Sequence, residues 1–390
     1  MRIHTFLSSL YPSLRIQQEI EVYGLFKKII WITLGVLLVG GIYFFFSADQ
    51  KLDEMVIDTD SAIIKKPATE LSTPNPSSVE TKVEEDPENY YVLMIGLDQR
   101  GNDLMLNTDS LIVAHIIPQE HLVKLISLPR DQKVSDPESP GNYKKINAIF
   151  AEGYNHALQE ARKDPSLLSG KKVSIGKKRI SEEYISSGMV ALRETFEDFL
   201  DISIANTFLV NFETVIGLVD EVGGIEINVD RSMQYTAEFD HTHIDLQRGL
   251  QLLDGRNALN YARHRLDDRG ANFESSDFDR GRRQQEVITA LVNKMSSWGN
   301  ITKTLDLLDI VTTNVKTDMS RGKMISLVKD FYGNLSSDTV ISVPYPGYWK
   351  SPYVHIDEDD LRETIEAFTS IERPIESTTG TLDDITVEDE

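Results

Sequence analysis

Apolar and polar residues follow two different periods between residues 90 and 345, and these periods predict the elements of a folded domain. Short apolar runs bounded by turn-forming residues predict strands at 90–97, 111–117, 122–128, 202–212, 225–229 and 340–343. Apolar residues at three-and-four spacing predict helices at 181–199, 213–221, 280–295, 304–315 and 321–335. The lysine-rich segment 171–179 is predicted to be an exposed loop. The order of strands and helices indicates an α/β sandwich.

A longer apolar run, Ile29–Phe46, has about 18 residues without a charge, which is enough to cross a bilayer as a helix. Lys27 and Lys28 precede the run, and acidic residues follow it. The positive-inside rule therefore predicts a single-pass cell-membrane protein with its N-terminus in the cytoplasm and the remaining chain outside. A cleaved signal peptide is the alternative, but the run is longer than a usual signal-peptide core and no small-residue cleavage site follows Phe46.

Composition then sets the domain limits. The region after the apolar run is rich in Ser, Thr, Pro, Glu and Lys, which predicts a flexible stalk, and the last residues lack any core pattern, which predicts an acidic disordered tail. The predicted organisation is a cytoplasmic segment at 1–28, a transmembrane helix at 29–46, an extracellular stalk at 47–89, a folded domain at 90–370 and a tail at 371–390.

Charge and residue usage exclude several classes of function. The formal net charge is −22, which argues against nucleic-acid binding because affinity for phosphate backbones comes largely from basic patches. The chain contains no cysteine, so disulfides, thiolate metal sites and cysteine nucleophiles are impossible. The GxSxG, HExxH and Walker patterns are also missing from the sequence, which disfavours the common hydrolase and nucleotidase mechanisms.

Against this acidic background, the stretch from Leu252 to Met295 carries seven arginines. Arg280, Arg282 and Arg283 lie at the start of a predicted amphipathic helix, where the helix dipole disfavours cations. Guanidinium groups and free backbone N–H groups at such an end form a phosphate site. The alternative is a solvated patch or ion pairs with the neighbouring carboxylates of Asp267, Asp268, Glu274 and Asp279.

Polar residues also cluster at the ends of the first three predicted strands. Asp98 and Arg100 follow the first strand, Asp109 precedes the second, and Arg130 and Asp131 follow the third. Loops held by a rigid sheet commonly carry binding sites, and two carboxylates can share one Mg²⁺ with water and phosphate. A role for the two aspartates in turns and caps is the alternative.

Seven motifs in one order give the chain a family resemblance: IGLDQR, NTDSLIVAHI, ISLPRD, KINAIFAEG, VNFETVIGLVDEVGGIEINVD, GLQLLDGRNALNYARHR and DFDRGRRQQEVI. They resemble the LytR-CpsA-Psr family of cell-wall glycopolymer ligases, and so does the order of membrane helix, stalk and domain. The resemblance implies a mixed central sheet flanked by helices, with an apolar pocket for a polyprenyl chain. One departure is the segment 266–276, which is longer and more acidic than the family pattern.

The resemblance also implies roles for individual residues. The metal-binding aspartates correspond to Asp98 and Asp109, with Mg²⁺ as the expected ion and Mn²⁺ as a possible substitute. Catalytic arginines that bind the diphosphate correspond to Arg130, Arg263, Arg265 and Arg280. Substrate contacts are expected from Gln284 and, at recurrent positions, from Arg100 and Arg283.

The implied reaction is a phosphotransfer. A hydroxyl of peptidoglycan would attack the phosphorus that carries a teichoic acid, capsule or other glycopolymer, and polyprenyl phosphate would leave. Asp98 and Asp131 are the candidate general bases. Two alternatives are a pyrophosphatase that uses water as the acceptor and a non-catalytic envelope regulator anchored in the membrane.

Overall fold

The computed structural model describes residues 52–64, 89–100, 103–136, 139, 141–175, 178–238, 242–296, 310–312, 314–331 and 339–372. The side chains of 98–100, 103–105, 107, 212, 213 and 296 lie outside this description. Contacts divide the chain into Met1–Asp53 and Glu54–Glu390, and the fold below is that of the second unit.

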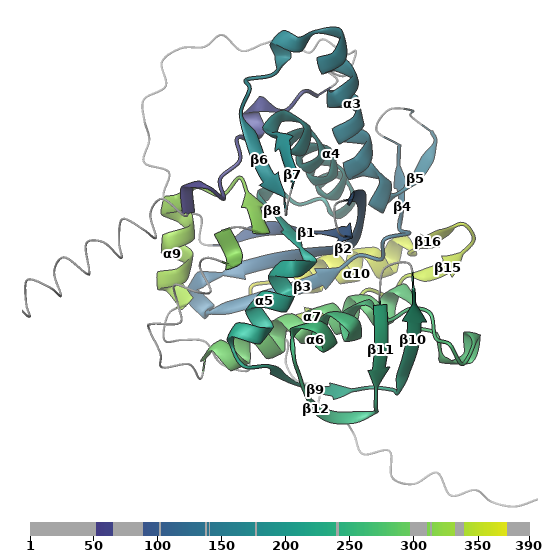
Figure 1. Cartoon of the computed structure of the whole chain (residues 1–390). Coiled ribbons are helices and arrows are strands. Elements are labelled where there is room, and N and C mark those ends of the chain that lie inside the picture. Colours follow the sequence, from purple (N-terminus) through teal and green to yellow (C-terminus); the bar gives the residue numbers. More distant parts are fainter. Residues whose placement is uncertain are drawn as a thin grey trace, which may run out of the picture. The chain divides into compact units, whose positions relative to one another are not determined.

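The centre of the fold is a mixed sheet of six strands in the order β13-β8-β1-β2-β3-β14 (Figure 1). Its strands are β1 (Tyr90–Arg100), β2 (Asp103–Ile117), β3 (Leu122–Ser127), β8 (Ile204–Asn211), β13 (Val315–Thr317) and β14 (Val340–Val343). β1, β2 and β3 pair antiparallel, whereas β8 and β14 pair parallel with β1 and β3. The predicted turn between β2 and β3 is present, with His121 in the left-handed conformation.

Two helices, α3 (Ile149–Lys163) and α4 (Glu182–Leu200), cover one face of this sheet (Figure 1). Their buried side chains join those of β1 in one core that includes Leu93, Phe150 and Phe196. The two helices approach closely at Gly153, where only a glycine fits. A Cβ at this position would lie 2.5 Å from the Ser187 carbonyl oxygen. The packing of these helices stabilises the central sheet, whose strand ends carry several of the candidate site residues.

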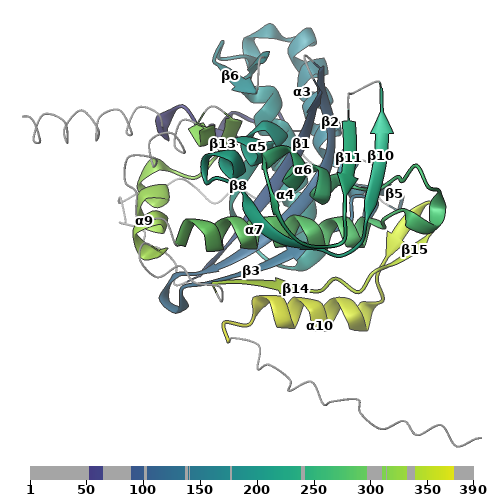
Figure 2. The same ribbon diagram turned by 60° about the horizontal axis from the view of Figure 1, so that its bottom comes forward.

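The opposite layer contains α5 (Phe212–Glu221), α6 (Gly255–Arg263) and α7 (Asp277–Ser296), and α7 crosses in front of the central strands in Figure 2. Two strand pairs accompany these helices: β9 (Ile225–Val229) with β12 (Gly249–Leu253), and β10 (Met233–Ala237) with β11 (Thr242–Leu246). They share a second core that includes Val229, Met233, Leu253, Tyr261 and Val287.

Shorter elements complete the unit. They are β4 (Lys133–Ser135), β5 (Tyr143–Lys145), β15 (Tyr348–Lys350), β16 (Tyr353–His355), α9 (Arg321–Phe331), α10 (Glu358–Thr369) and 3-10 helices at Thr59–Ser61, Pro118–Glu120, Ile146–Ala148, Pro165–Leu167 and Ala271–Phe273. The end of α10 is tied to the sheet, because the buried Lys124 Nζ donates to the carbonyls of Ala367 and Ser370 at 3.0 and 2.7 Å.

The mixed sheet with helices on both faces confirms the predicted α/β class, but one local prediction was wrong. Residues 171–179, predicted as a loop, form most of a hairpin of β6 (Lys172–Ile175) and β7 (Lys178–Ser181). Val173 and Ile175 are buried there, and the surrounding lysines hide this two-residue period in the sequence. The helix predicted at 304–315 falls largely outside the described residues. Residues 310–312 and 314 are helical, and Val315 begins β13.

Part of the predicted stalk also belongs to the folded unit. Met55 and Ile57 are each 2 % exposed, and the Ile57 amide donates to the Thr317 carbonyl at 2.7 Å. Two apolar side chains in a polar segment were too few to predict this packing. The predicted transmembrane run at 29–46 lies outside the described residues, and no helix within the described ranges is long and apolar enough to span a membrane.

Candidate functional site

The site begins at irregularities in the pairing of β1 with β2. Gly96 pairs with Ser110 and Leu97 pairs with Thr108, so Asp109 is an extra residue that forms a β-bulge. Asp98 lies at the next shift of register, between Leu97 and Gln99. Bulges re-aim side chains near functional sites. The backbone therefore places both predicted metal ligands at adjacent irregular positions of one hairpin.

Two of the predicted diphosphate-binding arginines meet at Asp109. Arg130 Nη1 donates to Asp109 Oδ1 at 3.1 Å, and Arg280 Nη2 donates to the Asp109 carbonyl oxygen at 3.0 Å. Arg130 follows β3 and Arg280 lies in the first turns of α7, so the contacts join three separate parts of the chain. A charged hydrogen bond of this kind orients each guanidinium fork firmly.

Asp277, the first residue of α7, is the second carboxylate of this group. Its Oδ1 accepts from Arg280 Nη1 at 3.0 Å, and its Oδ2 lies 3.6 Å from Arg130 Nε. The only sequence signal was its position three residues before Arg280, the spacing at which charged pairs meet on a helix. We therefore define the arginine cluster as Arg130, Arg263, Arg280, Asp109 and Asp277.

The arginine cluster retains positive charge that its own carboxylates do not neutralise. Arg280 is 7 % exposed, and burial lowers the pKa of its guanidinium. Asp277 and Asp109 oppose this lowering of the pKa, while the nearby charges of Arg130 and Arg263 add to it. Burial also acts to lower the pKa of Arg130, but Asp277 and Asp109 outweigh it and the pKa is raised.

Two buried donors in the cluster also lack a hydrogen bond, although one of them, Arg130 Nε, lies within ion-pair distance of Asp277. Within the described part of the chain, neither Arg130 Nε nor Arg280 Nε has a hydrogen-bond partner. An unpaired buried donor costs about 1–3 kcal/mol, and more when the group is charged. An anion that accepted hydrogen bonds from these nitrogens would recover that cost, so the geometry favours a phosphate group as the ligand.

The start of α7 brings Arg280 close to the sheet. Ser276 and Asp279 cap the helix reciprocally: Ser276 Oγ accepts from the Asp279 amide at 3.1 Å, and Asp279 Oδ2 accepts from the Ser276 amide at 2.9 Å. Gly281 permits a close approach to β3, because a Cβ there would lie 2.8 Å from Ser127 Oγ. The acidic residues of this first turn offset the cost of arginines near a helix N-terminus.

Arg283 has a different environment from Arg280, although both are in the predicted arginine stretch. It is fully buried, its Nε and Nη2 donate to the two oxygens of Asp230 at 3.1 and 2.9 Å, and its Nη1 donates to Ser275 Oγ at 2.8 Å. Its guanidinium carbon also lies 5.4 Å from the centre of the Tyr261 ring. These contacts occupy the donors of Arg283 inside the protein.

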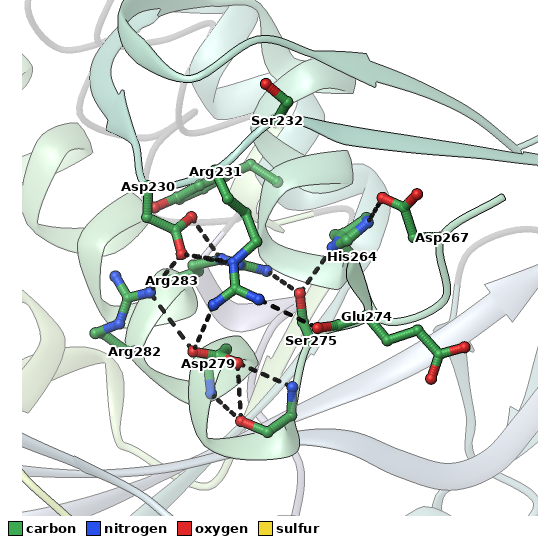
Figure 3. Close-up of polar contacts among 12 residues, drawn as sticks. Asp230, Arg231, Ser232, His264, Asp267, Glu274, Ser275, Asp279, Arg282 and Arg283 are labelled. Atoms are coloured by element: carbon green, nitrogen blue, oxygen red, sulfur yellow. Dashed lines mark hydrogen bonds and ion pairs between the residues drawn. The ribbon is translucent and has the colours of Figure 1, made fainter. Parts of the chain in front are cut away.

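Beyond Arg283, a hydrogen-bonded chain orders the long segment 266–276 (Figure 3). Ser275 Oγ lies 2.8 Å from His264 Nδ1, and His264 Nε2 lies 3.2 Å from Asp267 Oδ2. Arg269 binds both oxygens of Asp267, from Nε and Nη2, at 2.7 Å. The family departure noted in the sequence is therefore a loop anchored by its own side chains, directly beside α7.

The order Ser275, His264, Asp267 has the connectivity of a hydrolase triad. However, His264 is fully buried, Ser275 is 6 % exposed, and Ser275 Oγ already accepts the Arg283 N–H. A nucleophile must reach a substrate carbonyl, which this hydroxyl does not. The triad-like chain therefore positions Arg283 and the loop.

The remaining predicted residues have three outcomes. Arg263 is in the last turn of α6, and its positive charge lowers the pKa of Arg280. Gln284 Oε1 accepts a hydrogen bond from Ser110 Oγ at 2.9 Å, beside Asp109. Arg265 is exposed beyond α6, and its carbonyl accepts the Ser275 amide. Its substrate contact stays a prediction, as does that of Arg100, whose side chain lies outside the described residues.

The fit of a metal ion rests on Asp109. Its carboxylate is partly exposed next to two guanidiniums, and oxygen ligands of this kind suit Mg²⁺ together with phosphate. No group of three or more metal-ligating side chains occurs among the described residues. Asp131, a candidate base, is 5 % exposed and its Oδ1 is held by Lys145 Nζ at 3.1 Å.

A cavity of about 900 Å³ lies along the other side of α7, and its lining is mostly polar. Glu226, Asp230, Arg282 and Glu286 contribute charged groups to it, together with Val340 and Ser342 of β14. This lining differs from the apolar lipid pocket that the family resemblance implies.

Comparison with known proteins decides the family. The sequence profile of the LytR_cpsA_psr family matches residues 43–369. The chain belongs to this family. This LytR-CpsA-Psr protein is similar to the polyisoprenyl-teichoic acid–peptidoglycan teichoic acid transferase TagU of Bacillus mycoides, with 28% identity over 83% of this chain and 89% of the relative. It is also similar to the transferase TagV of Bacillus subtilis, with 27% identity over 66% and 56% of the two chains.

A solved structure supports the same assignment. The crystal structure of B. subtilis TagV superposes on this LytR-CpsA-Psr protein with a TM-score of 0.51 and 25% identity, covering 72% of this chain and 96% of that one. The mixed sheet and its flanking helices are therefore the family fold.

Proposed function

We propose that this protein transfers a glycopolymer from a polyprenyl diphosphate to peptidoglycan, forming a phosphodiester and releasing polyprenyl phosphate. The single observation that carries the proposal is the arginine cluster, in which buried guanidinium donors of Arg130 and Arg280 point to an anionic ligand. The names of the relatives support the same reaction, since TagU and TagV are called polyisoprenyl-teichoic acid–peptidoglycan transferases. Teichoic acid is therefore the polymer that we expect, ahead of capsule.

The residues of the cluster would act by position and charge. In the reaction a peptidoglycan hydroxyl oxygen forms a bond with the phosphorus that carries the polymer, the bond from that phosphorus to the bridging oxygen breaks, and the hydroxyl proton leaves to a base. Arg130, Arg263 and Arg280 hold the two phosphates and stabilise the charge that develops on the departing polyprenyl phosphate. Preorganised guanidinium groups in a site shielded from water do this better than solvent does.

Mg²⁺ is part of the proposal. Asp109, together with Asp98, would hold the ion, which would supply Lewis-acid stabilisation of the phosphate oxygens. The carboxylate of Asp109 supports this role because its position in the bulge places it against Arg130 and beside the Arg280 contact.

We also propose that the apolar run 29–46 anchors the protein in the cell membrane with the folded unit outside. The charge difference across the run supports this orientation. It would place the arginine cluster on the side where lipid-linked wall precursors and peptidoglycan are found together.

The test is the dependence of product release on the acceptor. Full-length protein in detergent receives a polyprenyl-diphosphate-linked polymer and Mg²⁺, with or without purified peptidoglycan, and both polyprenyl phosphate and wall-bound polymer are measured. We expect the two products in equal amounts, and only when peptidoglycan is present. Release of polyprenyl phosphate at the same rate without peptidoglycan would instead identify a pyrophosphatase.

A further inference from the structure

Two neighbouring hairpins of the folded unit carry large exposed aromatic side chains that the proposed chemistry does not use. Tyr348 and Trp349 of β15 are 44% and 54% exposed, and Tyr143 of β5 is 50% exposed. Tyr353 of β16 is partly exposed beside them. We call these four residues the aromatic platform. Large aromatic groups normally contribute to a core, so their joint exposure indicates a contact surface.

Two hairpins that are distant in sequence form this surface. The backbone at Gln132 bridges to that at Val354, and the Val354 amide donates to the Asp131 carbonyl at 2.8 Å. The Tyr353 hydroxyl donates to the Tyr143 carbonyl at 3.1 Å. The hairpins β4–β5 and β15–β16 also lie side by side in both ribbon views (Figures 1 and 2). The platform is therefore one continuous part of the fold.

Direct contacts connect the platform with the arginine cluster. Arg130 belongs to the cluster, and the next residue, Asp131, binds Lys145 Nζ through its carboxylate. Lys145 Nζ in turn lies 5.6 Å from the centre of the Trp349 ring. A ligand spread across the platform would therefore reach the edge of the proposed diphosphate site.

The rings are held in place before any ligand binds. Tyr348 stacks on His355 with ring centres 5.9 Å apart at 20°, and its hydroxyl donates to Asp357 Oδ1 at 3.2 Å. Lys133 Nζ lies 3.6 Å above the centre of the Tyr143 ring. Fixed rings lose little conformational entropy on binding, which favours recognition of a flexible chain.

The chemistry of the surface selects among possible ligands. The three cations Lys133, Lys145 and Lys350 are outnumbered by five carboxylates, those of Asp131 and Asp357 and three in the first turn of α10. This excess of carboxylates disfavours a polyanionic polymer or an anionic membrane. The large exposed hydrophobic side chains described on the two hairpins are all aromatic, without the aliphatic groups that insert into lipid. Flat rings with polar edges match the C–H faces and hydroxyls of pyranose sugars.

We propose that the aromatic platform binds the glycan strand that accepts the transferred polymer, and so brings one of its hydroxyls to the arginine cluster. This inference rests on the proposed function, because it assigns the acceptor of that reaction to a surface next to the site. The strand would lie along Trp349, with its reacting sugar beyond Lys145.

The first experiment measures binding without transfer. Full-length protein in lipid nanodiscs is sedimented with insoluble peptidoglycan from which attached polymers have been stripped by acid. We expect the double variant Tyr348→Ala, Trp349→Ala to bind about tenfold more weakly than the unchanged protein, because both large aromatic contact areas are removed. Trp349→Phe keeps a ring and should bind within about threefold. Leu250→Ala, at a 72% exposed apolar residue on β12, is the control and should bind normally.

The second experiment identifies the ligand at Trp349. The chain has three tryptophans, so Trp31→Phe and Trp298→Phe leave Trp349 as its one tryptophan emitter. We expect soluble glycan-strand fragments to change its fluorescence saturably, with no effect from free teichoic acid and no quenching by brominated lipids in the nanodisc. Quenching by brominated lipid, a response to teichoic acid alone, or full binding by the double variant would each overturn the inference.

The two proposals fail in different ways. An Arg280→Ala protein should lose transfer but still bind stripped peptidoglycan, because the platform does not include Arg280. If the platform variants bind glycan normally while acceptor-dependent transfer is confirmed, the inference is wrong and the proposed function stands. If glycan binding depends on the platform but no transfer occurs, the proposed function is wrong and the protein is a glycan-binding envelope component.

Discussion

Arg280 and Arg282 are two residues apart on α7 and have opposite environments. Arg280 is 7 % exposed and faces Asp109, Asp277 and the other arginines of the cluster. The side chain of Arg282 is 45% exposed and pairs with Asp230 and Glu286 on the outer side of the helix. Substitutions of Arg280 and Arg282 therefore distinguish the loss of a positive charge inside the cluster from the loss of one elsewhere on the same helix.

Replacing Arg280 should remove catalysis without comparable damage elsewhere. For Arg280→Ala we expect kcat/KM for transfer to fall by about 100-fold or more, the usual loss when one preorganised donor to a developing negative charge is removed. Arg282→Ala, the matched control, should stay within about threefold, because an exposed ion pair contributes little. Arg280→Lys should recover only part of the rate, since an ammonium keeps the charge but not the planar fork. Equal losses for Arg280→Ala and Arg282→Ala would contradict the assignment.

His264 is a residue whose protonation affects stability. In its neutral form, Nε2–H donates to Asp267 while Nδ1 accepts from Ser275, so every partner in the buried chain is satisfied. Burial and the charge of Arg283 lower the pKa of His264 more than Asp267 raises it. The unfolded chain therefore takes up this proton at a higher pH than the folded chain does, and stability falls as the pH drops below the unfolded pKa of about 6.5.

The measurement is urea unfolding of the full-length protein in detergent at pH 7.5 and 5.5. We expect the free energy of unfolding to decrease from the higher to the lower pH, and to decrease less in His264→Gln, whose amide can both donate and accept. Some decrease should remain in the variant because the buried His115 also has a lowered pKa, chiefly from burial. The same decrease in both proteins would show that His264 does not contribute.

At the level of elements, the site depends on how α6 and α7 approach their neighbours. Gly255 begins α6, and its amide donates to Asp220 Oδ1 at 2.7 Å. A Cβ at Gly255 would lie 2.2 Å from the Ile216 carbonyl oxygen of α5. Because that contact is with backbone, a rotating side chain cannot relieve it. The position of Arg263 at the other end of α6 depends on this close packing.

Gly255→Ala should therefore destabilise the folded unit by about 1–3 kcal/mol, the usual cost of overpacking. The matched control is Gly322→Ala in α9, where a Cβ would meet no atom within 4 Å. That change should stabilise by about 0.4–1 kcal/mol, because it reduces the freedom of the unfolded chain. Urea midpoints at fixed pH give both values, and a neutral Gly255→Ala would show that α5 and α6 can separate at little cost.

At the level of the whole molecule, a cationic site is held within a strongly acidic chain. The net charge of −22 repels an anionic substrate at long range, but salt screens that repulsion over about 8 Å under physiological conditions. The arginine cluster acts at shorter distances, where its guanidiniums are in contact with the ligand. Binding of an anionic substrate would therefore depend on short-range contacts with the cluster and not on long-range attraction.

The sequence by itself determined the features that depend on neighbouring residues. The periods of apolar side chains predicted every strand of the central sheet except β13, the helices α4, α5 and α9, the α/β class, and α7, the helix that carries Arg280. The ordered motifs predicted the family. Local features were sufficient because burial on one face repeats every two residues in a strand and every 3.6 in a helix.

Only the tertiary structure decided which charged groups meet. Arg280 binds the backbone of Asp109, and Arg283 donates its hydrogen bonds to Asp230. Asp277 joins the cluster through Arg130, which is far away in the sequence. The same holds for Met55, which becomes part of the core. Many carboxylates lie within reach of each arginine along the chain, and the choice between them depends on packing and desolvation, which arise when distant elements come together.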